Sequence, residues 1–468
     1  MQTPPVAPGD DRRGGVYTQV PMRIPTILSA LLAVVTAGAA VRGGEGETFD
    51  QLVARARRAT LRVLVGDHLT LVTDRPPRDG DGVEPLPGVF DAAWAGWCDH
   101  YGIDRGAHRD WHALGCLIVD RERFRAAGLL PETIPDFVNG HCHADRFWLA
   151  DQSNPDYRRH LLLHEGVHAF TLTLRDLDAP TWYTEGIAEY LATHRLGATT
   201  DGGGFLATPM PSRAGDVEQL GRIERIRFLR AQNACPGLEE IFATTATAHR
   251  DLSDYAGSWA AVALLARHPR YAQVFRTAER GPLDAAFTRR LSTAPGWDAA
   301  LAARDFDAFT DELDYGYDAD RSEIDWSPGR PLGDPRSIAV DGPRGWQNSG
   351  WSLEGGRRYS FTAAGRCAVG SLVGGSAGKG REPRRLESTA DGISLRWYRG
   401  RPLGRLLVAQ WVEEPPGGGR PRFVVLTEGG EGSFTAAVDG PVFCKINDPP
   451  GELADNEGRL DVTIAPAE

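Results

Sequence analysis

Two histidines and a glutamate in the stretch Tyr157 to Leu174, which reads YRRHLLLHEGVHAFTLTL, have the spacing of a metal site. His164, Glu165 and His168 form the pattern H-E-x-x-H, and residues four apart on a helix lie on one face, about one turn apart. Both imidazoles can therefore bind one metal ion. Glu165 lies beside the first of them, where it can accept a proton from a water molecule. Apolar residues at helical spacing in the same stretch predict the helix.

A second helical pattern, PTWYTEGIAEYLATHR, follows after a short break and supplies acidic residues. Glu185 lies 17 residues after His168, and Glu189 comes one helical turn later. Two histidines and one glutamate, with a fourth position left for water, are typical of a catalytic zinc site. Structural zinc sites are usually closed by four protein ligands, mostly cysteines, and the sequence contains no C-x-x-C pair.

HEGVH followed by PTWYTEGIAEY resembles the gluzincin zinc metallopeptidases, the group that contains thermolysin and the alanyl aminopeptidases. The resemblance implies that His164, His168 and Glu185 bind one zinc ion per chain and that Glu165 is the general base. It also implies that Glu189 hydrogen-bonds a ligand histidine, which fixes the tautomer of that ring. The aminopeptidase signature G-x-M-E-N is absent, which favours an endopeptidase.

Other residues near these motifs have weaker claims to a role in the site. His160 precedes His164 by one turn, but two successive steps of four residues drift around the helix, so we expect it outside the ligand set or at the surface. Adjacent residues of His141-Cys142-His143 point apart on a strand, which argues against a metal cluster there. Several gluzincins place a tyrosine near the scissile carbonyl; Tyr255 could fill that role, although a core or surface tyrosine is the simpler interpretation.

The composition and the start of the chain predict an exported protein. A net charge of -11 argues against a nucleic-acid partner, and 41% apolar residues suffice for large cores. From Met22 the chain reads MRIPTILSALLAVVTAGAA, a basic start, an apolar run and small residues, as in a signal peptide within residues 1–40. We expect the start at Met22 and a secreted, periplasmic or cell-surface protein. A retained anchor is the alternative, but the apolar run is shorter than the ~20 residues that span a bilayer.

If the chain is exported, its six cysteines can form disulfides. An even number in an exported chain is consistent with disulfides, and four of the six fall before residue 236, where three pairings are open. In the last region, Cys367 and Cys444 are the one available pair.

The order of patterns predicts an α+β protein with a two-lobed catalytic domain over residues 48–325. Residues 48–150 alternate strand and helix patterns, as in LRVLVGDHLTLVTD, VFDAAWAGWCDHYG, HALGCLIVD, RERFRAAG and FWLAD, so a mixed sheet precedes the metal helix. In gluzincins the edge strand of this sheet binds substrate by strand addition. Residues 196–325 are helix-rich and form a second lobe. A Pro/Gly-rich linker is expected at 326–335.

Residues 336–468 show short alternating segments with frequent Gly turns, which predict an all-β sandwich. The segments GWQNSGWSLEGGRRYSFTAAGR and CKINDPPGELADNEGRLDVTI resemble the calcium-dependent galactose-binding lectins of bacteria. The resemblance implies a Ca²⁺ site at Asn447, Asp448, Asp455 and Asn456, and a carbohydrate ligand. Oxygen-only ligands suit Ca²⁺, but Asp and Asn also form ordinary β-turns.

Three functions are consistent with these patterns. The first is a secreted zinc endopeptidase that acts on peptides or proteins and carries an accessory sandwich. The second is another zinc hydrolase on the same scaffold, for instance an exopeptidase or a peptidase of cell-wall peptides. The third is a non-catalytic carbohydrate- or surface-binding protein with a vestigial peptidase lobe. The presence of all three ligands and the base together favours catalysis. We further expect the sandwich to fold independently and to be dispensable for hydrolysis of short peptides.

Overall fold

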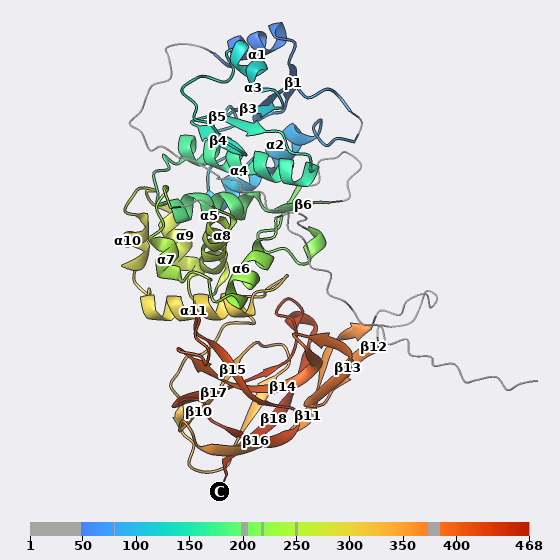
Figure 1. Ribbon diagram of the computed structural model, residues 1–468, viewed down its shortest axis with the longest axis vertical. Helices are drawn as coiled ribbons and strands as arrows, with labels where there is room; N and C mark the ends of the chain where they lie inside the picture. The colour runs from blue at the N-terminus through green and yellow to red at the C-terminus, as the bar shows by residue number, and fades with distance from the viewer. Residues whose placement is uncertain are drawn as a thin grey trace, which may run out of the picture.

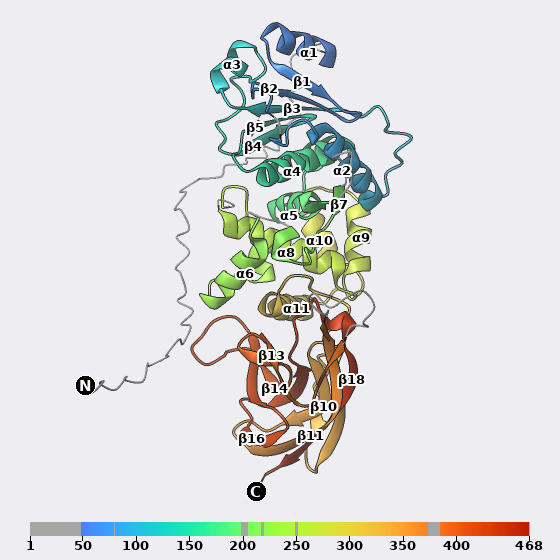
Figure 2. The ribbon, with the colours of Figure 1, turned by 90° about the vertical axis from the view of Figure 1, so that its right-hand side faces the viewer.

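The protein has an α+β fold in which a sheet with its helices, a helical lobe and a β-sandwich follow one another along the long axis (Figures 1 and 2). The structure, a computed structural model, describes residues 48–78, 80–197, 205–216, 220–248, 251–372 and 384–467. The expected signal peptide and the start at Met22 lie outside the described residues.

The first part is a five-stranded mixed sheet with helices on both faces. Its strand order is β1-β2-β3-β5-β4, with parallel pairing of β2 with β3 and of β3 with β5. The strands are β1 (Arg62–Val65), β2 (Leu69–Thr73), β3 (Ala113–Ile118), β4 (Gly140–His143) and β5 (Arg146–Ala150), and the helices are α1 (Phe49–Arg58), α2 (Leu86–Tyr101) and α3 (Arg121–Ala126). The strand and helix patterns expected before residue 150 are therefore confirmed.

The two faces of this sheet form separate cores because successive side chains of a strand point to opposite sides. Leu71 and Leu117 belong to the core that contains α2 and the long helix α4 (Pro155–Leu174). Val72 and Cys116 belong to the opposite core, which α1 and α3 cover. Every residue of β3 is buried, as expected of a strand covered on both faces.

Helix α4, which carries H-E-x-x-H, begins with a strong local signal. The Asn154 side chain accepts hydrogen bonds from the backbone N–H groups of Asp156 and Tyr157 at 2.8 and 2.9 Å, and Pro155 occupies the first helical position. A Cβ at Gly166 would lie 2.4 Å from Phe90 of α2. This glycine therefore lets α2 pack directly on α4.

The helical lobe is built around α5 and α8. Helix α5 (Thr181–Ala192) packs on α4 and on α8 (Leu252–Arg267), where a Cβ at Gly186 would lie 2.5 Å from the Ser258 carbonyl oxygen. The remaining elements of this lobe are β6 (His194–Leu196), β7 (Phe205–Ala207), α6 (Arg222–Ala231), α7 (Leu238–Phe242), α9 (Ala272–Arg280), α10 (Phe287–Ser292) and α11 (Ala299–Glu312). The helix-rich pattern expected over 196–325 is confirmed.

The C-terminal part is all-β, as its sequence pattern predicts. One sheet has the order β13-β14-β17-β10-β8 with β15 on β14, and the other has the order β12-β11-β18-β9 with β16 on β11. The strands are β8 (Arg330–Pro331), β9 (Arg336–Asp341), β10 (Gln347–Leu353), β11 (Arg358–Leu372), β12 (Arg384–Ser388), β13 (Asp391–Tyr398), β14 (Arg401–Val412), β15 (Arg422–Glu428), β16 (Glu431–Thr435), β17 (Gly440–Ile446) and β18 (Glu457–Pro466). Side chains from both sheets share one apolar core.

The segment expected as a linker packs against the sandwich. The Trp326 ring lies 5.1 Å from that of Trp411 and 5.7 Å from that of Phe443, and β8 pairs with β10. Helix α11 lies between the helical lobe and the sandwich (Figure 1), and its Ala308 belongs to the same apolar cluster as Phe443. The limits of the domains stay a prediction, but the two parts share a packed interface.

Ion pairs with low exposure also cross this interface. Arg420 of the sandwich donates to both carboxylate oxygens of Asp307 on α11 at 2.9 and 3.0 Å. Glu312, at the end of α11, pairs with Lys445 and with Arg399. Burial alone would raise the pKa of Glu312, but these two cations lower it to about 2. The sandwich therefore helps to neutralise acidic groups of the helical lobe. We expect its removal to deprive Glu312 of both cations and to leave Asp307 with Arg230 alone.

The expected disulfides are not formed. All six cysteines lie in the described residues and are free thiols, and five of them are buried. Cys367 and Cys444 lie in different sheets of the sandwich, on β11 and β17, and both pack in its apolar core. Burial raises the pKa of both thiols. These cysteines act as small apolar side chains.

None of the helices in the described residues combines the length and the apolar content that crossing a bilayer requires.

We predict that Lys445→Met lowers the free energy of unfolding by about 2–5 kcal/mol, because it leaves a buried carboxylate at Glu312 with one partner fewer. The double variant Glu312→Gln/Lys445→Met should regain most of this loss, since the unpaired charge is removed with its partner. Urea titration followed by tryptophan fluorescence measures both. A single variant as stable as the wild type would show that the ion pair does not hold the interface.

Candidate metal centre

Helices α4 and α5 bring the three predicted ligands together. The two Nε2 atoms of His164 and His168 lie 3.1 Å apart, and Oε2 of Glu185 lies 3.3 Å from the first and 3.5 Å from the second. All three side chains are buried, and their nitrogen and oxygen atoms are close enough to hold one metal ion. The spacing in the sequence therefore corresponds to a shared point in space.

The donor atoms fit a zinc ion. Oε2 of Glu185 and Nδ1 of His168 are both buried, and neither has a hydrogen-bond partner within the described residues. A buried carboxylate oxygen without a donor is costly, so its position between two imidazole nitrogens indicates a ligand that accepts electron pairs from all three. Two imidazoles and one carboxylate, with room for a fourth ligand, are the donor set of catalytic zinc.

The electrostatics of the centre also favour a cation. Burial lowers the pKa of the His164 imidazole, but Glu185 and Glu189 outweigh this effect and raise it to about 10. Burial opposes ionisation of Glu185 as well, yet the neighbouring histidines hold its pKa well below the usual range. The carboxylates thus create a negative potential that attracts positive charge to the histidines.

Glu165 lies next to the edge strand β4. Its side chain is buried, and a Cβ at Gly140 of β4 would lie 2.3 Å from its Oε1. Gly140 therefore leaves the space that the carboxylate occupies. Burial raises the pKa of Glu165, and the positive charge on His168 and His164 opposes the rise. Because β4 is the last strand of its sheet and contacts α4, the expected edge strand lies beside Glu165.

Glu189 is the most heavily bonded residue of the centre. Its Oε1 lies 3.3 Å from Nδ1 of His164, and its Oε2 lies 3.2 Å from Nε2 of His160. Arg222, the first residue of α6, donates to both oxygens, from Nε at 2.9 Å and from Nη2 at 2.7 Å. Burial would raise the pKa of Glu189, but Arg222 and His160 hold it well below the usual range. The carboxylate is therefore ionised and fixed.

This arrangement settles the place of His160. The alternative that it lies at the surface is wrong, because its side chain is 3% exposed and bonds Glu189 from inside the protein. His160, His164 and Glu189 are also close enough to hold a second metal ion. Arg222 already occupies both oxygens of Glu189, so a second cation would lie against a guanidinium. We therefore assign the His160 group to the support of His164.

Two tyrosines lie beside the centre. The ring of Tyr255 on α8 is buried, 6.0 Å from the ring of His164. Its pKa is raised well above the usual value, mainly by burial, so its hydroxyl stays protonated and can donate a hydrogen bond to an oxyanion. Burial also raises the pKa of Tyr157, whose hydroxyl feels the charges of Arg222 and Glu189. Tyr157 lies two turns before His164 on α4, a spacing that could have identified it.

His141, Cys142 and His143, the adjacent residues expected to point apart, lie side by side on one strand. They lie on β4, where His141 stacks on Trp148 with ring centroids 6.3 Å apart. Trp148 belongs to the core under α1 and α3, whereas Cys142 packs against the core on the α4 side. The alternation of the strand thus separates them.

Two of the four expected calcium residues, Asp448 and Asn456, have buried oxygens without partners in the described part of the chain, whereas Asp455 is exposed. Both carboxylate oxygens of Asp448 and Oδ1 of Asn456 are buried without a hydrogen-bond partner in the described residues. Burial, with Glu452 and Asp455 nearby, raises the pKa of Asp448 to about 7. Asn447 differs, because its amide donates to three carbonyls of the β13–β14 turn, at Tyr398, Arg401 and Pro402.

Comparisons with known proteins add little to this geometry. No protein-family model and no curated protein matches the chain. Among solved structures, the EclA N-terminal domain, described as a PllA-like lectin, aligns with 28% of this chain and 95% of its own length. The identity is 17% and the TM-score 0.20, so this likeness carries no argument about ligands.

We predict that Arg222→Gln weakens zinc affinity about 10–100-fold, as the loss of groups that orient a ligand histidine does. The reason is that Glu189 would lose both guanidinium bonds and no longer hold His164. Competition with a chromogenic chelator measures the affinity.

Arg225→Gln is the matched control, since Arg225 lies one turn later on α6 and bonds Ser253 instead. Equal zinc affinities for the two variants would contradict the role assigned to Arg222.

Proposed function

We propose that the protein is a secreted zinc-dependent peptidase of the gluzincin type that acts as an endopeptidase. The observation that carries the proposal is the convergence of His164, His168 and Glu185, with the unpartnered Oε2 of Glu185 between the two imidazoles. The buried base Glu165 beside this point, and an edge strand next to the base, are the other parts that peptide hydrolysis requires.

His164, His168 and Glu185 would hold the zinc ion. When bound, zinc lowers the pKa of a water molecule to near 7 and polarises a carbonyl group. The charges around the ligands suit this task, because a carboxylate 3.3 Å from Nδ1 of His164 favours the tautomer with the proton on Nδ1 and leaves the Nε2 lone pair for the metal ion.

Glu165 would accept a proton from the attacking water and later deliver it to the departing amine. Its burial fits both roles, since the raised pKa makes the carboxylate a stronger base and its conjugate acid a usable donor. Tyr255, protonated and 6.0 Å from the His164 ring, is the donor proposed for the oxyanion of the tetrahedral intermediate. The free edge of β4 would align the peptide beside the base by strand addition.

We prefer an endopeptidase over an aminopeptidase because each carboxylate of the centre already has a partner or a proposed role. Glu185 faces the imidazoles, Glu189 is bonded by Arg222 and His160, and Glu165 is the base. Among these described carboxylates none is left to bind the free amine of a substrate.

A second function, calcium-dependent carbohydrate binding, is proposed for the sandwich. The observation that favours it is the pair of buried, unpartnered oxygens on Asp448, together with Oδ1 of Asn456. Oxygen-only donors suit Ca²⁺, and a calcium ion would balance a carboxylate whose burial otherwise raises its pKa to about 7. The sandwich would then attach the peptidase to a glycan-bearing surface.

We predict that Glu165→Gln retains zinc and loses turnover by about 10²–10⁴-fold, the contribution of general base catalysis. The amide has nearly the size of the carboxylate but accepts no proton. Cleavage of a quenched fluorescent peptide at equal zinc occupancy measures the loss.

Glu122→Gln, an exposed change on α3, is the control and should cleave like the wild type. Turnover of Glu165→Gln within a few-fold of that control would overturn the proposed base and, with it, the proposed mechanism.

We predict that millimolar Ca²⁺ raises the melting temperature of the full-length protein and that Asp448→Asn removes this response. A ligand that binds the folded state stabilises it by mass action, and the substitution takes one charged donor from the site. Differential scanning fluorimetry measures the shift, with the exposed Asp461→Asn as control. The absence of any shift in the wild type would remove calcium from the proposal.

A further inference from the structure

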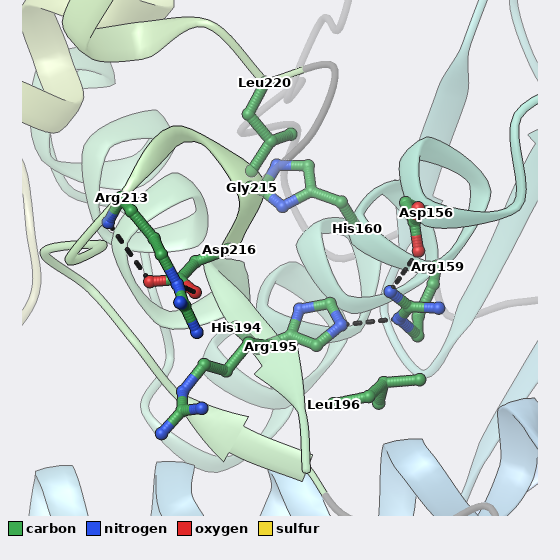
Figure 3. A pocket seen from close by; sticks show the side chains of 10 residues that line it. All are labelled: Asp156, Arg159, His160, His194, Arg195, Leu196, Arg213, Gly215, Asp216 and Leu220. Carbon is green, nitrogen blue, oxygen red and sulfur yellow. Dashed lines mark hydrogen bonds and ion pairs between the residues drawn. The ribbon is translucent and has the colours of Figure 1, made fainter. Parts of the chain in front are cut away.

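A polar pocket adjoins the metal centre on the side where α4 begins. Its volume is about 380 Å³, and it lies between the first turns of α4, strand β6 and the turn that contains Arg213 (Figure 3). His160 forms part of its wall and bonds Glu189, which in turn contacts His164. Two side chains thus connect the pocket wall to a proposed zinc ligand.

The wall of this pocket carries more positive than negative charge. It includes three arginines, two aspartates and two histidines. Burial lowers the pKa of both histidines, that of His194 to about 3, and neither adds to the negative charge of the wall. Nε2 of His194 accepts a hydrogen bond from Nε of Arg159 at 2.6 Å, while its Nδ1 lies 2.7 Å from the Ala192 carbonyl oxygen. The pocket wall therefore has one more guanidinium than carboxylates.

Both aspartates are already engaged. Arg159 donates to Asp156 at 2.6 Å on one side of the pocket, and Arg213 donates to Asp216 at 3.0 Å on the other (Figure 3). The second oxygen of Asp216 accepts the backbone N–H groups of Ser212 and Arg213. These carboxylates orient the two arginines and have little capacity left for a third cation.

Arg195 on β6 is the remaining guanidinium. It is exposed, and it makes no ion pair with a carboxylate in the described residues. A guanidinium binds carboxylates in a bidentate geometry, and here Arg159 and Arg213 line the same cavity. The volume is near the lower end for ligand pockets, enough for one acidic side chain or one chain end.

We propose that this pocket is an anion subsite of the catalytic centre and that the peptidase prefers substrates with a carboxylate at the position that enters it. The inference rests on the proposed function and names its substrate class. The carboxylate can come from an aspartate or glutamate side chain or from the C-terminus of the peptide. Arg195 is the residue that would determine the specificity.

The test uses zinc-loaded, full-length protein and matched peptides. One pair differs by Glu against Gln at successive positions around the cleaved bond, and a second pair differs by a C-terminal acid against the amide. We expect kcat/KM to favour the acidic member of one pair by about ten- to a hundredfold, the effect of one charge-assisted hydrogen bond. The pair that shows the preference identifies the source of the carboxylate.

Arg195→Gln should reduce this ratio to about one, since the charge is removed and the size kept, and Arg195→Lys should retain part of it. Arg276→Gln, an exposed change on α9 outside the pocket, should keep the full ratio. Cleavage without charge preference, or a preference that survives in Arg195→Gln, would overturn the subsite and leave the proposed peptidase standing.

A binding measurement separates the two proposals if cleavage fails. Zinc-loaded Glu165→Gln binds peptides without turnover, so calorimetry can compare the acidic and neutral members of each pair directly. Acid-selective binding that Arg195→Gln abolishes would support the subsite even without turnover in the wild type, and the proposed hydrolysis alone would then fail. Equal binding of both members would overturn the subsite.

Discussion

Two carboxylates one helical turn apart on α5 lie against the two ring nitrogens of a single histidine on α4. Oε2 of Glu185 is 3.3 Å from Nε2 of His164, and Oε1 of Glu189 is 3.3 Å from Nδ1 of the same ring. Burying such charges costs several kcal/mol per ion unless partners compensate them. The other contacts around the proposed metal centre compensate for this burial.

Those contacts come from both sides of the centre. Gly166 lets α2 pack closely on α4, and Gly186 lets α8 pack closely on α5. These contacts hold α4 and α5 against each other. Arg222 of α6 supplies the guanidinium that neutralises Glu189. Glu165 and Glu185 have no arginine or lysine partner in the described residues, and a divalent zinc ion would balance their negative charge. The proposed anion subsite lies behind His160, beyond the carboxylates, where arginines outnumber aspartates.

The sequence predicts well those features that depend on local periodicity. The spacing of His164 and His168 predicts two imidazoles on one face of a helix, because a helix fixes the relative direction of residues four apart. Glu185, on the next helix, is predicted by the resemblance to the gluzincins. The alternating patterns likewise predicted the strands of the first sheet and the all-β C-terminal part. Residues that reach the site across long sequence separations were not predictable: Arg222 bonds Glu189 from 33 positions away, and no spacing rule relates them.

The expectations that differ from the structure also concern contacts between segments that are far apart in the sequence. The idea of disulfides came from an even number of cysteines, but pairing depends on the distance between strands, and each thiol packs in an apolar core instead. The linker at 326–335 stays a prediction, but its Pro and Gly content gives no sign that Trp326 packs against Trp411, Phe423 and Phe443 of the sandwich. A surface position for His160 followed from its drift around α4, and it was wrong because Glu189 reaches it from α5.

The most direct test of the central claim is zinc K-edge X-ray absorption on purified wild-type protein with its metal content measured in parallel. The account predicts one zinc per chain with nitrogen and oxygen neighbours at about 2.0–2.2 Å, two of them imidazoles, and no sulfur. Loss of the imidazole signal in His164→Ala would assign the ligands to this helix. Protein that takes up no stoichiometric zinc, or zinc with sulfur neighbours at about 2.3 Å, would contradict the centre described here.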